Sequence, residues 1–484
     1  GKHYVSQMLR TRMRCQQGIK GSSVKQAEWE AIQAWVDQKE EYAVSSLMSL
    51  LVIPTVAYPD RANPSLTECA RALVDRLRAL GAKDARIAGS ELLPLVLDSL
   101  GDDAGKPTLL VYGHFDVVDP GPQIDWQSDP FSPTIRNGRV YGRGSGDNKG
   151  QFIAHLLAVE AFQESGVGLP VNLKFVFDGA EEIGSPSLAE LRSQDEQSML
   201  ADLVYAADGS AHESGQPKVL LGSRGVVFVE VMVRTLRRRA HSQYAGVLPN
   251  AVWRALEIMA SLRDPRGRVL VRGFYEDVLP TTSYEMELLT RLPPVRSELT
   301  REFEPVPPLP DEPAQEFNAR LLMEPVINIA GIQAGDLSIH QTVVPDSCMV
   351  QLDIGIVPGQ SVARTMQLLR DHLSAFSIEP EDVHMVFGVE PAQTPPDHPL
   401  VVPIANAVGR AWGVPPVVVN RFAAFSPHHA NWQALGIPVI SASYAQPDQS
   451  NHAPNENLSL ENFRKSILAS AAVFDTVGTA LGVG

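Results

Sequence analysis

Five side chains that could bind metal ions are spread along the chain, and a further acid stands beside one of them. The candidate ligands are two histidines and three carboxylates, in the order His114, Asp147, Glu182, Asp208 and His452, and Glu181 is the additional acid. Imidazole and carboxylate groups together suit zinc, and they also accept manganese or cobalt. Two ions that share a ligand can activate water, and a free carboxylate can move its proton. The residue types therefore favour a two-metal hydrolytic site.

The first candidate ligand follows an apolar run. Residues 109–118 read LLVYGHFDVV, a pattern typical of a buried strand that leads into a loop. Because residues two apart in an extended chain point the same way, Asp116 can accept the second ring N–H of His114. That bond would fix the tautomer that leaves one nitrogen for a metal. A strand-end histidine that is simply hydrogen-bonded to a neighbouring acid is the alternative.

Asp147 lies in a glycine-rich stretch, GRVYGRGSGDNKG at 138–150, before a predicted helix over 151–164. Glycine-rich loops before helices can also bind phosphate, but this spacing matches neither GxxxxGK[ST] nor GxGxxG in its strand context. We interpret the glycines as allowing the bend that lets Asp147 bridge two cations, with a phosphate site as the alternative. His155, within that helix, is expected to be packed in the core.

The remaining candidates follow strands or lie in a loop. VNLKFVF at 171–177 leads into DGAEEIGS, where the adjacent acids Glu181 and Glu182 can point in different directions, one to a metal and one to water. LVYAA at 203–207 ends on the lone carboxylate of Asp208. His452 lies in a turn-rich loop before a final helical pattern, and loops on rigid scaffolds commonly carry functional residues.

Taken together, these segments resemble the di-zinc peptidases and deacylases that include carnosinase-type dipeptidases, glutamate carboxypeptidase, aminoacylase and succinyl-diaminopimelate desuccinylase. The matching stretches follow the family's order from about residue 40 onward, and they are GHFDVV, DWQSDPF, GRVYGRGSGDNKG, DGAEEIGSPS, AADG and NHAPNEN. The chain length and the stretch RGFYEDVLP look most like the carnosinase-type branch.

The resemblance implies two divalent metal ions per chain, with zinc expected and manganese or cobalt as alternatives. One ion would be bound by His114, Asp147 and Asp208. The other would be bound by Asp147, Glu182 and His452, which makes Asp147 the bridge. Glu181 would be the general base, and Asp116 would be the partner of His114. His241 matches the family histidine that stabilises the oxyanion, often from the neighbouring subunit; an exposed histidine in a basic run is the alternative.

Two departures from the family pattern concern the substrate. In DIGIVP, at 353–358, Gly355 stands where the family has an Arg that binds the substrate carboxylate, and glycine cannot replace a bidentate guanidinium. The family's Gly-Gly-Ser turn reads FAAFSP here, after Arg421. Substrate-contact candidates are Arg421, Ser426 and Asn250, with His428 and His429 as further possibilities.

We therefore predict a hydrolase that cleaves the amide bond of a dipeptide or similar small peptide. One alternative is an N-acyl amino acid amidohydrolase, and a weaker one is an inactive relative that only binds. The formal net charge of −15 argues against a nucleic-acid partner. No apolar run approaches the ~18 residues that suggest a membrane span. Cys15, Cys69 and Cys348 are too few and too scattered for a disulfide framework. We expect a cytoplasmic location, with a removed leader as the alternative.

The 484 residues exceed one ordinary hydrophobic core, so two domains are expected. Alternating strands and helices over residues 1–220 predict an α/β domain with a largely parallel sheet. The resemblance implies that this is the catalytic domain, with a mainly parallel mixed sheet flanked by helices, and that residues 386–484 complete it. The resemblance implies that 221–385 form an inserted α+β lid and dimerisation domain with a four-stranded antiparallel sheet, and hence a homodimer. The Pro- and Glu-rich stretch 291–314 is interpreted as an ordered-to-loose excursion and not as a linker between independent domains.

Overall fold

The computed structural model describes residues 24–482 except 294, 336–337 and 339–340. By their internal packing, the described residues form two compact units. The first comprises the described residues up to Leu221, together with Thr394–Asn420 and those from Asn431 onward. The second comprises Gly222–Gln393 and Arg421–Ala430. The chain thus leaves the first unit at 222, and the proposed boundaries of the catalytic and inserted domains stay a prediction.

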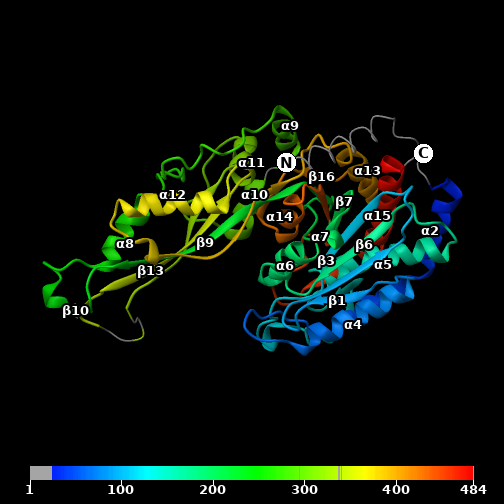
Figure 1. The fold of residues 1–484 in the computed structure, drawn as a ribbon, viewed down its shortest axis with the longest axis horizontal. Coiled ribbons are helices and arrows are strands. Elements are labelled where there is room, and N and C mark those ends of the chain that lie inside the picture. Colours follow the sequence, from blue (N-terminus) through cyan, green and yellow to red (C-terminus); the bar gives the residue numbers. More distant parts are fainter. Residues whose placement is uncertain (1–23, 294, 336–337, 339–340, 483–484) are drawn as a thin grey trace. The chain divides into compact units, whose positions relative to one another are not determined.

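The first unit contains an eight-stranded mixed sheet (Figure 1). In spatial order its strands are β1 (Arg86–Gly89), β2 (Pro94–Leu100), β6 (Asn172–Asp178), β3 (Thr108–His114), β7 (Leu203–Ala207), β18 (Val439–Ser443), β8 (Lys218–Leu220) and β16 (Val417–Val419). The central neighbours β6, β3, β7 and β18 pair in parallel, as do β8 and β16. β1 with β2, β2 with β6, and β8 with β18 are antiparallel. The predicted mainly parallel mixed sheet is confirmed.

Both faces of the sheet are buried at its centre. On β3, Leu109 and Val111 belong to one hydrophobic core, and Leu110 and Tyr112 belong to the core on the opposite face. Strands covered on both faces read as continuous apolar runs, which is the pattern of residues 109–112. The helices whose buried residues form the larger core are α2 (Gln26–Gln38), α3 (Glu40–Leu51), α4 (Pro64–Ala79), α5 (Lys149–Glu164), α13 (Val401–Trp412) and α15 (Leu460–Leu481). The opposite core takes residues from α6 (Pro186–Gln194), α7 (Glu196–Met199) and α14 (Pro427–Gln433).

The helix that follows the glycine-rich stretch begins at Lys149, two residues before the predicted start. Every residue of α5 from Lys149 to Phe162 is buried, because α5 packs against β3, α3 and α15 at once. A helix enclosed in this way has no polar face to show a one-sided pattern. His155 is buried in it beside the rings of Tyr205 and Tyr444.

A small sheet joins distant segments of the first unit. β5 (Arg139–Tyr141) pairs with both β4 (Thr134–Arg136) and β19 (Asn457–Ser459). The pairing sets Asn457 opposite Tyr141, so the loop that precedes β19 lies beside the glycine-rich stretch that follows β5. Two short 3-10 turns complete this unit, η1 (Gln123–Asp125) and η2 (Glu181–Ile183).

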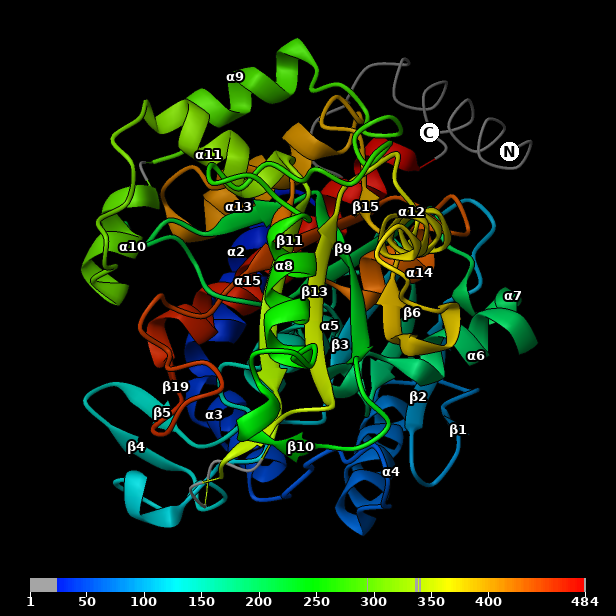
Figure 2. The same ribbon diagram turned by 90° about the vertical axis from the view of Figure 1, so that its left-hand side faces the viewer.

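The second unit is built on an antiparallel sheet. Its order is β11 (Val326–Gln333), β13 (Ser347–Ile356), β9 (Gly222–Arg234) and β14 (Val383–Val389), and the short strands β15 (Ala392–Gln393) and β17 (Phe422–Phe425) also pair with β9. Helices α8 (Ala251–Ala260) and α12 (Val362–Ser374) contact the sheet (Figure 2). Their core takes alternate residues of β9, namely Val227, Val229, Val231 and Val233. The expected four-stranded antiparallel sheet is present.

The other elements of the second unit are β10 (Ala240–His241), β12 (Val343–Val344), η3 (Ser242–Tyr244), η4 (Pro380–Asp382), α9 (Ser283–Arg291), α10 (Val295–Phe303) and α11 (Ala314–Met323). Helix α10 is an ordered part of the Pro- and Glu-rich stretch that we interpreted as an ordered-to-loose excursion. The helix packs against α11, a tertiary contact that composition does not reveal. Among the described residues, no helix is long and apolar enough to cross a membrane.

Candidate metal centre

Three candidate ligands lie at one edge of the eight-stranded sheet. His114 is the last residue of β3, Asp208 directly follows β7, and Glu182 lies in η2 shortly after β6. These three strands are parallel neighbours, so their carboxyl ends meet at the same edge, where open α/β sheets bind ligands. Asp147 reaches this edge from the loop before α5.

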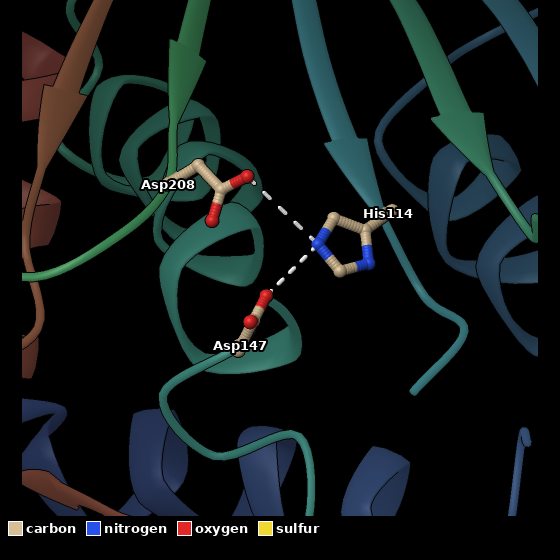
Figure 3. A group of neighbouring side chains, drawn as sticks. All are labelled: His114, Asp147 and Asp208. Atoms are coloured by element: carbon tan, nitrogen blue, oxygen red, sulfur yellow. Dashed lines mark ion pairs between the residues drawn. The ribbon is translucent and has the colours of Figure 1, made fainter. Parts of the chain in front are cut away.

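The first group consists of His114, Asp147 and Asp208. Nε2 of His114 lies 3.0 Å from Oδ1 of Asp147 and 3.9 Å from Oδ2 of Asp208. Figure 3 shows both carboxylates directed at the same ring nitrogen. The other oxygen of Asp208 accepts the N–H of Gly209 at 2.6 Å, which fixes the carboxylate so that Oδ2 remains available.

The second group consists of Asp147, Glu182 and His452. Nε2 of His452 lies 3.1 Å from Oδ2 of Asp147 and 3.1 Å from Oε2 of Glu182. Asp147 therefore turns one oxygen to each group. In each group the candidate donor atoms lie within 4.8 Å of one another, so the three side chains can converge on one ion.

The charges and burial of the five candidate ligands indicate whether cations could bind among them. Burial raises the pKa of Glu182 to about 7 and that of Asp208 to about 6, and the charge of Asp147 adds to both shifts. Oε1 of Glu182 is buried without a hydrogen-bond partner among the described residues. Several buried carboxylates that face one another are costly unless a positive charge joins them. Two imidazoles and three carboxylates also form a donor set suited to zinc-like ions. The residues present therefore fit the divalent metal ions that the family resemblance implies.

Asp116 does more than the sequence indicated. Nδ1 of His114 lies 3.2 Å from the backbone carbonyl oxygen of Asp116 and 3.4 Å from its Oδ1. The same carboxylate accepts the N–H of Glu181 at 3.1 Å and that of Glu182 at 3.0 Å. Asp116 thus orients His114 and also holds the turn that carries both glutamates. No spacing rule connects residues 65 positions apart, so the sequence did not reveal this second contact.

Glu181 lies beside the ligands but belongs to neither group. Burial raises its pKa well above the ordinary value, His114 opposes the shift, and the neighbouring charges of Glu182 and Asp208 add to it. A carboxylate whose pKa is raised binds a proton more strongly, which is the property that a general base needs.

The backbone of the glycine-rich loop surrounds the carboxylate of Glu456, a residue from the segment before β19. The backbone N–H groups of Gly144, Gly146 and Asp147 all donate to Glu456, at 2.9–3.1 Å. A phosphate-binding loop would present such N–H groups to its ligand. Here they are already used by the protein, which argues against the phosphate alternative.

The remaining candidates lie in the second unit. His241 ends β10, is exposed, and accepts the N–H of Gln243 on Nδ1 at 3.1 Å. The side-chain oxygen of Asn250 accepts the N–H groups of Val252 and Trp253 at the start of α8. Asn250 is therefore a helix cap, and an Asn just before a helical pattern is the signal that could have predicted it.

The guanidinium of Arg421 already has protein partners. It donates to Oε1 of Gln393 at 2.6 Å, and it lies 3.5 Å from Oε1 of Glu285. Oγ of Ser426 lies 3.0 Å from Nδ1 of His428. A Cβ added at Gly355 would lie 3.6 Å from Cδ of Arg224, whose side chain therefore flanks this glycine. Roles for these residues in substrate binding stay predictions.

Comparison with known proteins supports the resemblance found in the motifs. The sequence model of Peptidase family M20/M25/M40 matches residues 110–476. Cys-Gly metallodipeptidase dug1 of Schizosaccharomyces pombe is 28% identical over 451 residues, which cover 89% of this chain and 94% of the relative. The Beta-Ala-His dipeptidase of Homo sapiens is 26% identical over 466 residues, with 92% of each chain covered.

Two solved structures share the fold. An M20 family metallo-carboxypeptidase from Sulfolobus solfataricus, Sso-CP2, superposes with a TM-score of 0.81 at 28% identity, covering 90% of this chain and 99% of the other. Human carnosine dipeptidase 1 gives a TM-score of 0.75 at 26% identity, with 93% and 98% covered. Because the family match spans most of the sequence and includes the whole candidate centre, the chain belongs to peptidase family M20/M25/M40 and is a metallopeptidase.

Proposed function

We propose that this metallopeptidase is a two-metal dipeptidase that hydrolyses the amide bond of a dipeptide or a similar small peptide. The observation that carries the proposal is the placement of Asp147, whose two oxygens face two separate ligand groups. The relatives reported above include two dipeptidases, so we do not favour the N-acyl amino acid amidohydrolase. The full set of ligands and the presence of Glu181 argue against an inactive relative.

In this proposal different residues bind the metal ions, transfer the proton and position the other groups. When bound, two divalent cations would lower the pKa of a water molecule and polarise the substrate carbonyl. His114, Asp147 and Asp208 would hold one ion, and Asp147, Glu182 and His452 would hold the other. Glu181 would take the proton from the attacking water and deliver it to the leaving nitrogen. Asp116 would hold Glu181 and His114 in fixed positions relative to each other. Zinc is the expected metal, with manganese or cobalt as alternatives.

A substrate panel tests the proposed function. The enzyme, loaded with zinc, manganese or cobalt in turn, is offered free dipeptides, the same dipeptides with amidated C-termini, and N-acyl amino acids. We expect turnover of the free dipeptides and loss of that turnover on chelation. Gly355 stands where the family has the Arg that binds the substrate carboxylate. We therefore expect amidation of the C-terminus to lower the rate less than it would in an enzyme that binds this carboxylate with a bidentate guanidinium. Turnover of N-acyl amino acids without turnover of dipeptides would instead establish the amidohydrolase.

The oxyanion role of His241 is tested by His241→Ala. Loss of one such hydrogen-bond donor typically lowers kcat about 10²–10³-fold, since the donor acts on charge that develops in the transition state. Metal content should stay unchanged, because His241 belongs to neither ligand group. His384→Ala, which removes another exposed histidine of the same unit, serves as the control. Equal kcat values for the two variants would remove His241 from the mechanism.

The homodimer that the family resemblance implies is part of the proposal, and it predicts that His241 acts on the partner's site. Mixing His241→Ala subunits with Glu181→Gln subunits should then raise activity above that of either variant alone, because one site of the mixed dimer keeps both groups. Size-exclusion chromatography with light scattering gives the oligomeric state directly. Activity no higher than that of the separate variants would place both groups on one chain. A cytoplasmic location remains a prediction.

A further inference from the structure

We propose that Glu456 is a positioning residue of the metal centre, one that holds the loop carrying Asp147 and ties it to the loop carrying His452. The inference rests on the two-metal function proposed above. It concerns a side chain that would itself bind no metal and would touch no substrate.

The carboxylate of Glu456 is enclosed by hydrogen-bond donors. Oε1 accepts the backbone N–H groups of Gly144 at 3.1 Å, Gly146 at 2.9 Å and Asp147 at 2.9 Å. Oε2 accepts the N–H of Gly144 at 3.1 Å and Nη1 of Arg143 at 2.7 Å. The side chains of Glu456 and Arg143 are 0% and 1% exposed. The carboxylate therefore has these protein donors in place of water.

One hydrogen bond of Glu456 is made with a candidate ligand, Asp147. The N–H of Asp147 donates to Oε1, while the side chain of the same residue directs its two oxygens to His114 and His452. A shift of this backbone would move both oxygens of the proposed bridge together. Groups that orient metal ligands typically change metal affinity about 10–100-fold when they are removed.

Glu456 also belongs to the segment that supplies the other ligand. It follows His452 by four positions, and its backbone carbonyl accepts the N–H of Gly142 at 3.0 Å. The next residue begins β19, which pairs with β5. The two segments approach so closely that a Cβ at Gly146 would lie 2.0 Å from Oε1 of Gln449. Glu456 thus links two loops that are about 300 positions apart in the sequence, and its hydrogen bonds add to the pairing of β5 with β19.

Glu456→Gln is the variant that tests this role. A glutamine of the same shape must turn its NH₂ group toward one side of a site that contains only N–H donors, so at least one bond to the Asp147 loop or to Arg143 is lost. We expect the zinc dissociation constant, measured by chelator competition, to rise about 10–100-fold. The visible absorption spectrum of the cobalt-loaded protein should also change, because the ligand geometry shifts.

The matched control is Glu160→Gln. It breaks the other well-shielded Arg–Glu pair of the same unit, in which Nη2 of Arg76 lies 2.8 Å from Oε1 of Glu160. Neither residue contacts the ligand loops by any hydrogen bond described for the structure. A purely structural role for Glu456 predicts that both variants lose stability and both keep the zinc affinity of wild type. Our proposal predicts a loss of affinity for Glu456→Gln alone.

The outcomes separate this inference from the proposed function. If wild type itself binds no zinc, the two-metal function fails. If wild type binds zinc and folded Glu456→Gln binds it equally well, with an unchanged cobalt spectrum, only the positioning role fails. If Glu456→Gln does not fold, Glu456→Asp decides by the same comparison with wild type and Glu160→Gln. The aspartate keeps the charge but is one methylene shorter, so it should give a smaller loss of affinity.

Discussion

Glu181→Gln is expected to lower kcat by about 10²–10⁴-fold, the usual contribution of a positioned general base. Glutamine keeps the size and shape of the side chain but cannot accept a proton from water. Because Glu181 belongs to neither ligand group, elemental analysis should find wild-type metal content in the variant. Steady-state kinetics with the best dipeptide of the panel, at saturating metal, give the change in kcat.

Two neighbouring variants serve as controls for this result. Glu182→Gln changes the adjacent carboxylate, which does lie in a ligand group, and should lower metal content as well as rate. Glu190→Gln removes an exposed acid of α6 and should leave both unchanged. A Glu181→Gln enzyme that retained the wild-type kcat would refute the assignment of the base.

Asp147→Ala should remove both metal ions, whereas Asp208→Ala and Glu182→Ala should each weaken mainly one of them. The reason is geometric, because only Asp147 belongs to both groups. Without its negative charge, His114 and His452 also lose the carboxylate that lies within 3.1 Å of each ring. Turnover should fall to the level of the chelator-treated enzyme.

Metal stoichiometry measured by elemental analysis, after dialysis against a fixed free zinc concentration, checks this prediction. We expect two ions per chain in wild type, an intermediate content in the variants of a single group, and almost none in Asp147→Ala. Retention of two ions by Asp147→Ala, or a wild-type content that never exceeds one, would contradict the shared bridge.

Several features of the centre were predictable because they depend on local patterns. Apolar runs followed by His114, Glu182 and Asp208 predicted strands with polar residues at their ends, and parallel strands bring such ends to one edge. The family resemblance supplied the division of the ligands between two ions.

Other features depend on contacts that no local pattern encodes. Asp116 binds the N–H groups of Glu181 and Glu182, and Glu456 binds the loop of Asp147. Hydrogen bonds of a carboxylate to backbone N–H groups require no particular residue type in the partner, so the sequence contains no trace of them. Helix α10 likewise lies in a Pro- and Glu-rich stretch for which no helix was predicted, and it packs against α11.

By itself, then, the sequence determined which residues could bind metal ions and that three of them, His114, Glu182 and Asp208, would follow strands. These properties follow from residue type and from periodicity, which act over a few neighbouring positions. Only the tertiary structure decided that Asp147 turns one oxygen to each ligand group and that Glu456 occupies the glycine-rich loop. Both depend on backbone positions set by pairings such as that of β5 with β19, which join residues about 300 positions apart.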